Sequence, residues 1–434
     1  FSFWVKRSKI GAQQSIFRST DSGTNDSHVT FQADDTLRFE EYGGQSSIGK
    51  LQTTQVFRDI SAWFHIVLVY DSGNGTAGNR MRMYVNGTEV TSFGTDTNPS
   101  QNADSYFNKS GEVLSFGRTP YSGGSTYFDG YVAELVMCDG QAYAASDFGE
   151  FDSDSPTIWK PKDVSGLTFG NNGFYLDFEA SGNLGNDANG GTDFSESGLA
   201  AADQATDSCT NNFATINPLD NYYANSTFSK GNCTIVQGSS TYAHNTSTIA
   251  VTAGKWYVEA KLTTDSEHAL VGITDTPALG TGTKILGSAA HDYSIKQSNG
   301  DLFNNRGDDP ANDATDYAAA YAQNDIIGIA LDCDNNKLYF SKGGAWSDGS
   351  GSWDSTTFNA SVGAITITAP ASTDNGHYFF ASGDYGSASC TWEWNFGGCP
   401  PFSISSGNAD DNGYGNFEYD VPAGYLALCT KNLG

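Results

Sequence analysis

Few of the side chains that commonly perform chemistry occur here in a reactive spacing. His65 lies within an apolar run without an accompanying nucleophile or acid, so we expect a buried, hydrogen-bonded structural histidine. The seven cysteines show no CxxC spacing and none lies near a histidine pair, which argues against a zinc site. Most are expected to be buried thiols. A disulfide between Cys390 and Cys399, or between Cys209 and Cys233, stays open.

Carboxylates in turns are the second kind of reactive group. Asp71 and Asp129 border strand-like segments and offer the hard oxygen ligands that calcium prefers, although no spacing forms a recognisable calcium loop. The segment 332–336, DCDNN, looks like the start of an EF-hand loop, but it lacks the later Gly and the Glu at the twelfth position. We therefore expect a β-turn there, and calcium at Asp71 or Asp129 is the one cofactor left open.

Aromatic and polar residues in predicted loops are candidates for ligand binding. Exposed aromatic rings are favoured anchors for sugars and proteins, and packing in the core is the alternative for each of them. The candidates are Tyr293, Trp346, Trp353, Asp384 and Tyr385.

The composition excludes several classes of partner. The 434 residues include 22 Lys and Arg against 50 Asp and Glu, a formal net charge of −28, which repels nucleic acid and anionic membrane surfaces. The longest apolar runs fall far short of the ~20 residues that a membrane-spanning helix needs. Aromatic residues make up 13% of the chain, far more than disordered chains contain.

The elements that must position these residues are strands. Short alternating segments, separated by turn signals such as Asn86-Gly87, predict an all-β chain with two antiparallel β-sandwich (jelly-roll) domains. We expect the first domain at 1–150 and the last at 226–434. Between them, 151–225 is predicted to be a long, partly ordered connector with short strands.

The first domain carries three characteristic strand patterns. They are WFHIV at 63–67, YVNG at 84–87 and FDGYVAEL at 128–135. In this order they resemble the laminin-G-like, concanavalin-A-like group of β-sandwiches. Residues 1–6 resemble an early core strand of that group, so its first strands are expected upstream of residue 1. The resemblance implies a two-sheet sandwich that binds sugars or proteins, often with calcium at its rim.

Some members of the wider superfamily are glucanases, in which two glutamates bracket an aspartate on one strand. The nearest match here is residues 175–179, YLDFE, where Tyr175 replaces the first glutamate. Glycoside hydrolysis needs a pair of carboxyl groups at a fixed separation. We therefore expect Asp177 and Glu179 to form the polar face of a strand, and we expect no enzyme activity.

The last domain carries a longer set of patterns. They are GKWYVE at 254–259, VGI at 271–273, DIIGIALDCDNNKLYF at 325–340 and NFG at 395–397. In this order they resemble a SPRY domain over roughly 247–398. One departure is Lys342-Gly343-Gly344, where the family usually has Asn-Gly. The resemblance implies binding of partners through loops at one rim, without catalytic residues.

Phrases in the connector and in the C-terminal extension resemble marine bacteriophage structural proteins. They lie at 159–163, at 217–221 and in the tail 404–429. This resemblance implies a non-enzymatic virion-surface protein, a tail fibre, spike or head-fibre adhesin, with lectin-like domains for host attachment. Its implied partners are a host-surface glycan or protein and other virion proteins. Phage fibres are commonly trimers, so a homotrimer is also implied, although no coiled-coil repeat is present.

Two alternatives remain for the function. The chain could be a secreted bacterial carbohydrate-binding adhesin, or a purely architectural protein that decorates a particle without binding a receptor. A signal peptide would favour secretion, but the sequence opens on FSFWV, which is typical of a strand already in progress.

Overall fold

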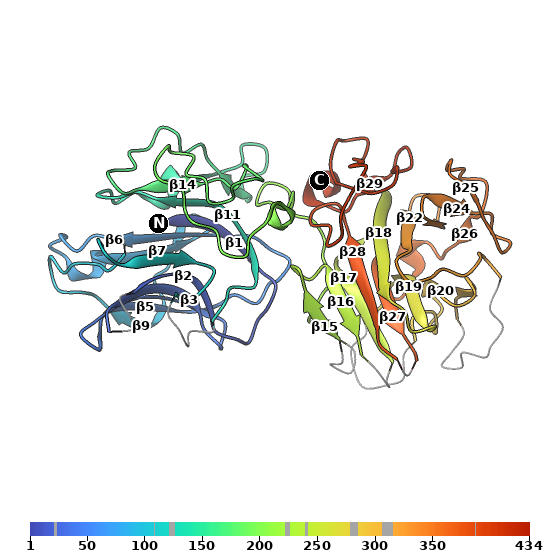
Figure 1. Ribbon diagram of the computed structural model, residues 1–434, viewed down its shortest axis with the longest axis horizontal. Helices are drawn as coiled ribbons and strands as arrows, with labels where there is room; N and C mark the ends of the chain where they lie inside the picture. The colour runs from blue at the N-terminus through green and yellow to red at the C-terminus, as the bar shows by residue number, and fades with distance from the viewer. Residues whose placement is uncertain are drawn as a thin grey trace. The chain divides into compact units, whose positions relative to one another are not determined.

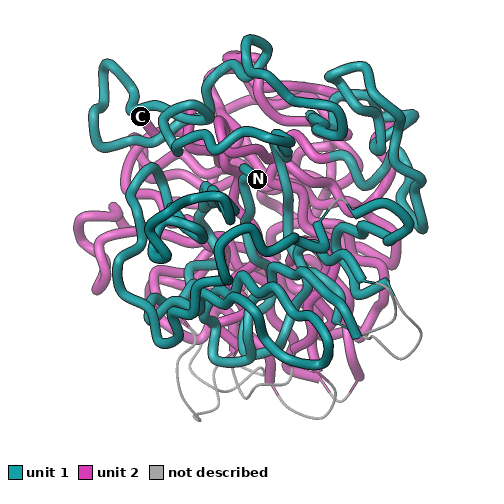
Figure 2. Tube along the Cα trace, turned by 90° about the vertical axis from the view of Figure 1, so that its left-hand side faces the viewer, with its two compact units in different colours: residues 1–204 teal, residues 205–434 magenta. Residues whose placement is uncertain are grey.

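The computed structural model describes residues 1–20, 24–107, 109–120, 126–221, 226–238, 242–277, 285–305, 316–386 and 388–434. It divides the chain into two compact units, 1–204 and 205–434, which Figure 2 shows in different colours. Nearly all regular structure is β, which confirms the predicted fold class (Figure 1). Within the described ranges, no helix is long and apolar enough to cross a membrane. Among the described residues, the helices are the short η1 (Ala77–Asn79), η2 (Ala145–Asp147), η3 (Ala201–Asp203), η5 (Pro370–Ser372) and α1 (Thr430–Leu433).

Unit 1 contains two six-stranded antiparallel sheets and a two-stranded ribbon. The first sheet has the order β14 (Phe174–Leu176), β11 (Gly130–Met137), β1 (Ser2–Arg7), β6 (Phe64–Tyr70), β7 (Met81–Val85) and β8 (Thr88–Glu89). The second has the order β10 (Val113–Phe116), β2 (Gln14–Thr20), β3 (Asp26–Phe31), β4 (Thr36–Gly43), β5 (Ser46–Val56) and β9 (Phe93–Thr97). The ribbon pairs β12 (Gly149–Phe151) with β13 (Trp159–Pro161).

Strand β6 is apolar at nearly every position because both of its faces are covered. Ile66 and Leu68 point into the core between the two sheets, while Val67 and Val69 belong to a second cluster on the opposite face. That second cluster includes Phe148, Val164 and Phe169, so the segment after β11 covers the outer face of the first sheet. Continuous apolar strands are expected where both faces are buried.

The turn between β7 and β8 has the conformation that its residues predict. Asn86 and Gly87 both have positive φ, 47° and 79°, as a two-residue hairpin loop requires. Gly87 also allows a close approach, because a Cβ there would lie 2.6 Å from the Trp159 ring. Part of the predicted connector, including Trp159, therefore packs into unit 1.

Unit 2 contains a large and a small sheet. The large sheet has the order β15 (Thr227–Ser229), β16 (Thr234–Gln237), β28 (Cys390–Asn395), β18 (Lys255–Thr264), β22 (Ile326–Asp332), β23 (Lys337–Lys342), β24 (Ala345–Ser347) and β25 (Trp353–Ser355), with β26 (Ile365–Thr366) beside β23 and β29 (Leu426–Ala427) parallel to β18. The small sheet has the order β17 (Ala243–Val251), β27 (Tyr378–Asp384), β19 (Ala269–Thr274), β20 (Tyr293–Lys296) and β21 (Leu302–Phe303).

Strand β22 lies in the middle of the large sheet and is buried along its whole length. Ile327 and Ile329 enter the main core with Val271 and Trp392, while Ala330 enters a second cluster formed with C-terminal residues of the chain. At the end of β22, Asp332 Oδ1 accepts hydrogen bonds from the backbone N–H groups of residues 334 and 335, at 3.1 and 2.9 Å. This confirms the predicted turn and explains the EF-hand-like sequence.

The residues predicted as a connector are shared between the two units. Residues 151–204 group with unit 1, where β14 extends the first sheet, and residues from 205 onward group with unit 2. The predicted boundary at 225 falls on residues outside the described ranges. The Cys390 thiol is free and donates to Gln237 Oε1 at 3.4 Å, so the Cys390–Cys399 disulfide is not formed.

Candidate functional site

One end of the unit-2 sandwich carries a half-buried tryptophan. Trp353 begins β25, its indole N–H donates to the Ala319 carbonyl at 2.8 Å, and Lys342 Nζ lies 5.9 Å from its ring centre. The hydrogen bond fixes the ring while leaving part of it accessible to solvent. Such a fixed, partly exposed ring is suited to stacking against an apolar or sugar face.

Tyr385 lies at the same end of the sandwich. Tyr385 follows Asp384, which pairs with Ala269 at the start of β19. The Ala269 carbonyl accepts the Tyr321 hydroxyl at 3.2 Å, two residues along the chain from the carbonyl that accepts the Trp353 indole N–H. The Tyr385 ring is half-buried, 4.7 Å from His268 and 6.0 Å from Phe303. Lys296 Nζ lies 5.6 Å from its centre. Two aromatic rings, each with a lysine ammonium beside it, therefore occur at this end.

The two lysines are functional candidates that the sequence reasoning missed. Neither Lys342 nor Lys296 lies next to an aromatic residue in sequence. Their placement follows from the strand order: β24 lies between β23, which ends at Lys342, and β25, which begins at Trp353, and β20 ends near Tyr385. Predicted strand pairing would place both lysines beside the aromatic rings, whereas a sequence motif would not, because each lysine is distant in sequence from the ring that it contacts.

Two of the predicted binding residues are core residues. Tyr293 is 5% exposed within β20, and its hydroxyl accepts a hydrogen bond from the Thr368 N–H at 3.0 Å. Trp346 is 8% exposed within β24, and its ring lies 4.8 Å from Phe358. The expectation that both residues lie in exposed loops is wrong, because the Gly-rich flanks of Trp346 form a hairpin and Phe358 covers the ring.

Asp384 is also buried, at 1% exposed, as the last residue of β27. Burial raises the pKa of its carboxyl group, and its Oδ1 accepts the Gly386 N–H at 2.6 Å. Asp384 therefore supports the turn that presents Tyr385, rather than offering a surface carboxylate. Of the five predicted binding residues, the structure brings Trp353 and Tyr385 to accessible positions at one end.

The two predicted calcium ligands lie at opposite ends of a sheet. Ser2 of β1 pairs with Val67, four residues before Asp71, while Ser8 donates its N–H to the Asp129 carbonyl. Ten strand positions of ~3.3 Å therefore separate the two carboxylates, so they cannot share an ion. Within the described part of the chain, neither belongs to a group of three metal-ligating side chains. Burial raises the pKa of Asp129. The residues thus do not fit the calcium site that the family resemblance implied.

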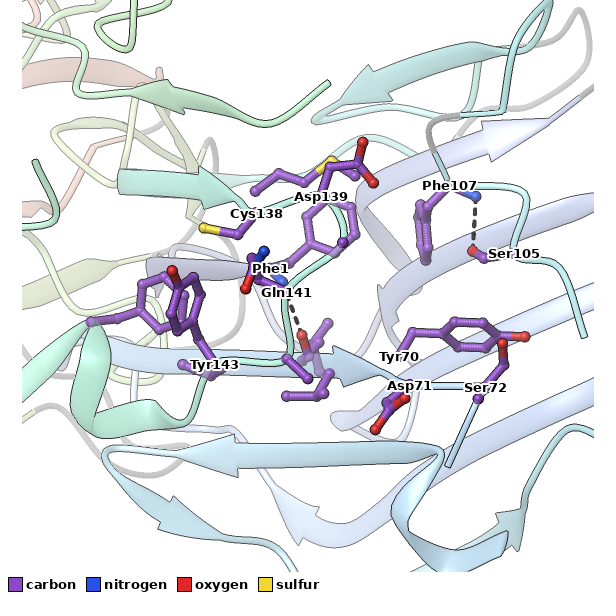
Figure 3. Close-up of a pocket in the computed structure, with 18 residues that line it drawn as sticks. Phe1, Tyr70, Asp71, Ser72, Ser105, Phe107, Cys138, Asp139, Gln141 and Tyr143 are labelled. Atoms are coloured by element: carbon purple, nitrogen blue, oxygen red, sulfur yellow. Dashed lines mark hydrogen bonds between the residues drawn. The ribbon is translucent and has the colours of Figure 1, made fainter. Parts of the chain in front are cut away.

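A pocket of about 360 Å³ lies in unit 1 beside Phe1 (Figure 3). Its walls are residues 67–73, in and after β6, and residues 137–143 after β11. Because β1 pairs with both β6 and β11, and Phe1 exchanges backbone hydrogen bonds with Leu68, the pocket continues the line of β1. Ser105, Phe107 and Phe148 complete its lining.

His65 is a structural histidine, as predicted. Its ring is fully buried, stacks on Trp4 with centres 4.8 Å apart, and accepts the Trp159 indole N–H at Nδ1 (2.9 Å). The proton must then be on Nε2, which donates to Ser2 Oγ at 2.8 Å. Burial lowers the pKa of His65 to about 3. Both ring nitrogens are engaged, so this Ser–His contact is not a nucleophile with its base.

The carboxylates of the glucanase-like segment are arranged differently from a catalytic pair. Tyr175, at the position of the first glutamate, pairs with β11 and donates its hydroxyl hydrogen bond to Glu134. Burial raises the pKa of Glu134. The expectation that Asp177 and Glu179 form the polar face of a strand is wrong, because β14 ends at Leu176. The two residues lie in the segment after it, where Asp177 Oδ1 accepts the backbone N–H of Glu179 at 3.0 Å. A tyrosine thus stands at the position of the first glutamate, and its hydroxyl is hydrogen-bonded to the half-buried Glu134.

Comparisons with known proteins place a domain type in each unit. A sequence profile described as the Concanavalin A-like lectin/glucanases superfamily matches residues 1–144, and the SPRY domain profile matches residues 255–371. No curated protein matches the chain. Among solved structures, the SPRY domain of human HERC1 matches with 13% identity over 41% of this chain and 96% of that chain, at a TM-score of 0.30. That score is too low to support an argument.

Both domain types are generally non-catalytic and typically serve ligand binding or adhesion. The profile matches agree with the residues that suggested the two families, including the FDGYVAEL strand of unit 1 and the hairpin of β22 and β23 in unit 2. The chain therefore contains a laminin-G-like, concanavalin-A-like domain followed by a SPRY domain.

Proposed function

We propose that this chain is a non-enzymatic adhesin of a bacteriophage virion surface, a tail fibre, spike or head-fibre protein that attaches to a host-surface glycan or protein. The observation that carries the proposal is the end of unit 2 where Trp353 and Tyr385 are half-buried beside Lys342 and Lys296. Aromatic rings bind the apolar faces of sugars, and lysines donate hydrogen bonds to hydroxyl and carboxylate groups.

Two contacts in unit 1 support the proposal that the protein is not an enzyme. The His65 ring is neutral with both nitrogens engaged, and Tyr175 holds Glu134. Binding requires only rigid placement of these surface groups, which the strands of both sandwiches provide.

The virion location rests on the resemblance of the connector and tail phrases to marine bacteriophage structural proteins. Other virion proteins would be the partners of the assembled particle, and a homotrimer is the oligomer that fibres commonly form. The strongly acidic surface suits a salty medium, where ions screen the repulsion between carboxylates.

The test is binding of the full chain to an array of bacterial surface polysaccharides and to marine bacterial cells. Trp353→Ala and Tyr385→Ala should each weaken binding about tenfold or more, since loss of a stacked aromatic anchor costs at least ~1.4 kcal/mol. Tyr127→Ala is the matched control, because Tyr127 is an exposed tyrosine of unit 1, at 63%. It should bind like the wild type.

Two results would contradict the proposal. If no polysaccharide and no cell binds the wild-type chain, the architectural role replaces host attachment. If the chain releases reducing sugar from a polysaccharide that it binds, the non-enzymatic assignment is wrong.

A further inference from the structure

A cluster of metal-ligating side chains lies at the other end of the small sheet in unit 2. Within the described ranges, Asp275, His291 and Asp374 form one group of three whose ligand atoms all lie within 4.8 Å of one another. Asp275 is buried, His291 is half-buried and Asp374 is exposed, so the cluster opens to solvent on one side.

The strand register brings the three residues together. Ile273 of β19 pairs with Tyr293 of β20, so Asp275 and His291, two positions further along, face each other across the same ladder. On the other side of β19, the chain approaches through η5 before it enters β27. There the Asp374 N–H donates to Asp275 Oδ2 at 3.1 Å.

Two properties of the cluster indicate a cation. His291 Nδ1 is buried but has no hydrogen-bond partner among the residues that the structure describes. Within the same residues, neither Asp275 nor Asp374 has an ion pair with a lysine or arginine. Two adjacent carboxylates repel each other, and a buried imidazole nitrogen without a partner is costly, so a shared cation would relieve both.

The loop that carries His291 is held independently of the cluster. The next residue, Asp292, is fully buried and accepts hydrogen bonds from Thr274 Oγ1 at 2.6 Å and from the Ala289 N–H at 3.1 Å. The Asn304 side chain donates to the backbone carbonyls of the residues before and after His291, at 3.0 and 2.8 Å. His291 is therefore presented from a fixed turn, as a preorganised ligand should be.

We propose that Asp275, His291 and Asp374 bind a divalent zinc ion, with water completing the coordination. One imidazole and two carboxylates are ligands that zinc accepts, whereas calcium prefers oxygen alone. Ligands around zinc at ~2.1 Å lie roughly 3.4 Å apart. Since the three ligand atoms lie within 4.8 Å of one another, each pair closes by at most about 1.4 Å on binding, mainly through exposed Asp374. The cysteine spacing excludes only a cysteine-ligated zinc site, and this cluster contains no cysteine.

The ion would connect three segments that are far apart in sequence: the end of β19, the turn before β20 and the approach to β27. A ligand that binds the folded state alone stabilises that state in proportion to the logarithm of its concentration. Zinc at a hundredfold excess over its dissociation constant should therefore raise the melting temperature of unit 2 by about 5 °C or more.

The test uses the full chain, stripped with EDTA and titrated with zinc chloride in a calorimeter. His291→Asn and Asp374→Asn should each remove one equivalent of bound zinc and the thermal shift. His268→Asn and Asp354→Asn are the matched controls: His268 lies at the opposite end of the same sheet, and Asp354 is an exposed aspartate of β25. Both controls should retain the zinc. Cobalt bound at the site should give a visible spectrum that His291→Asn abolishes.

Two outcomes would overturn the assignment. If all four variants bind as much zinc as the wild type, the ion is elsewhere, for example on the thiols. If calcium binds at this site more tightly than zinc and is lost in the same two variants, the ion class is wrong. Amide hydrogen exchange of β19 and β20 in the metal-free variants checks that the fold is retained. Neither outcome affects the glycan-binding proposal, which concerns the opposite end of unit 2.

Discussion

Burial of His65 should make unit 1 less stable in acid. The pKa of this histidine is lowered to about 3 in the folded chain by burial, against about 6.5 in an unfolded chain. Between these values the unfolded state binds one more proton than the folded state, so stability is lost as the pH falls from 6.5 towards 3. From pH 7 to pH 4.5 the loss from this one group is about 2.5 kcal/mol.

A specific hydrogen bond, in addition to desolvation, disfavours protonation of His65 in the folded chain. Protonation would place a second N–H at Nδ1, directly facing the Trp159 indole N–H that now donates to it at 2.9 Å. Two donors cannot hydrogen-bond each other, so the charged ring loses this bond and gains no partner among the described residues. The protonated form is therefore disfavoured by a specific contact as well as by the apolar surroundings.

The assay is the difference in stability between the wild type and His65→Gln, measured from pH 7 to pH 4.5. Other carboxylates and histidines titrate equally in both proteins, so their contributions cancel in the difference. Urea unfolding of the full chain, read by pulsed hydrogen exchange on peptides of β1 and β6, reports on unit 1. At pH 7 the wild type should be more stable by about 1–3 kcal/mol, because the variant loses the Trp159 bond.

As the pH falls to 4.5, the stability of the wild type relative to the variant should fall by about 2.5 kcal/mol, which removes the advantage or reverses it. A difference that stays constant over the whole range would refute the reasoning, since it would mean that His65 titrates alike in the folded and unfolded chain. Trp159→Phe supplies the second test, because removal of the indole N–H should raise the pKa of His65 in a histidine NMR titration.

Three further predictions concern unit 2. Gly272→Ala should lower its melting temperature by several degrees in calorimetry, because a Cβ at this position would lie 1.9 Å from the Tyr293 carbonyl oxygen. Burial raises the pKa of Glu259 to about 7, so the folded state holds an extra proton and loses about 2.5 kcal/mol of stability as the pH rises from 4.5 to 7. In urea unfolding over that range, Glu259→Gln should lack this decline, and an equal decline in both proteins would contradict it. Burial raises the pKa of the Cys333 thiol to about 12, so a thiol reagent should label Cys333 only once unit 2 unfolds; rapid labelling of the native chain, seen by mass spectrometry, would show the thiol to be accessible.

The sheets were predictable because their signal is local. Alternation marks strands with one covered face, and continuous apolar runs such as β6 and β22 mark strands covered on both faces. The Asn86-Gly87 turn and the Asp332 turn were predictable for the same reason, since each depends on a few adjacent residues. The boundary between the two units along the chain was harder to predict from the sequence. It depends on β14, which joins unit 1 by pairing with β11 and not through its neighbours in sequence.

Exposure of single aromatic residues was not predictable, because it depends on distant parts of the chain. Trp346 and Trp353 lie in the same Gly- and Ser-rich stretch, yet Trp346 is buried and Trp353 is half-exposed. The difference arises from Phe358, which packs on Trp346 and is itself 5.4 Å from Tyr425 near the end of the chain. No local pattern contains that contact.

The metal cluster shows most clearly which information a linear sequence lacks. Asp275 and His291 are separated by a long stretch without any motif, and Asp374 follows far downstream. Their proximity depends on the register between β19 and β20, because side chains alternate between the two faces of a strand. A slip of one residue would bring Asp275 opposite a neighbour of His291 and move the imidazole to the other face. A site of this kind becomes visible only when the pairing of strands is known, and its ligands are therefore best sought at the ends of paired strands rather than in sequence spacings.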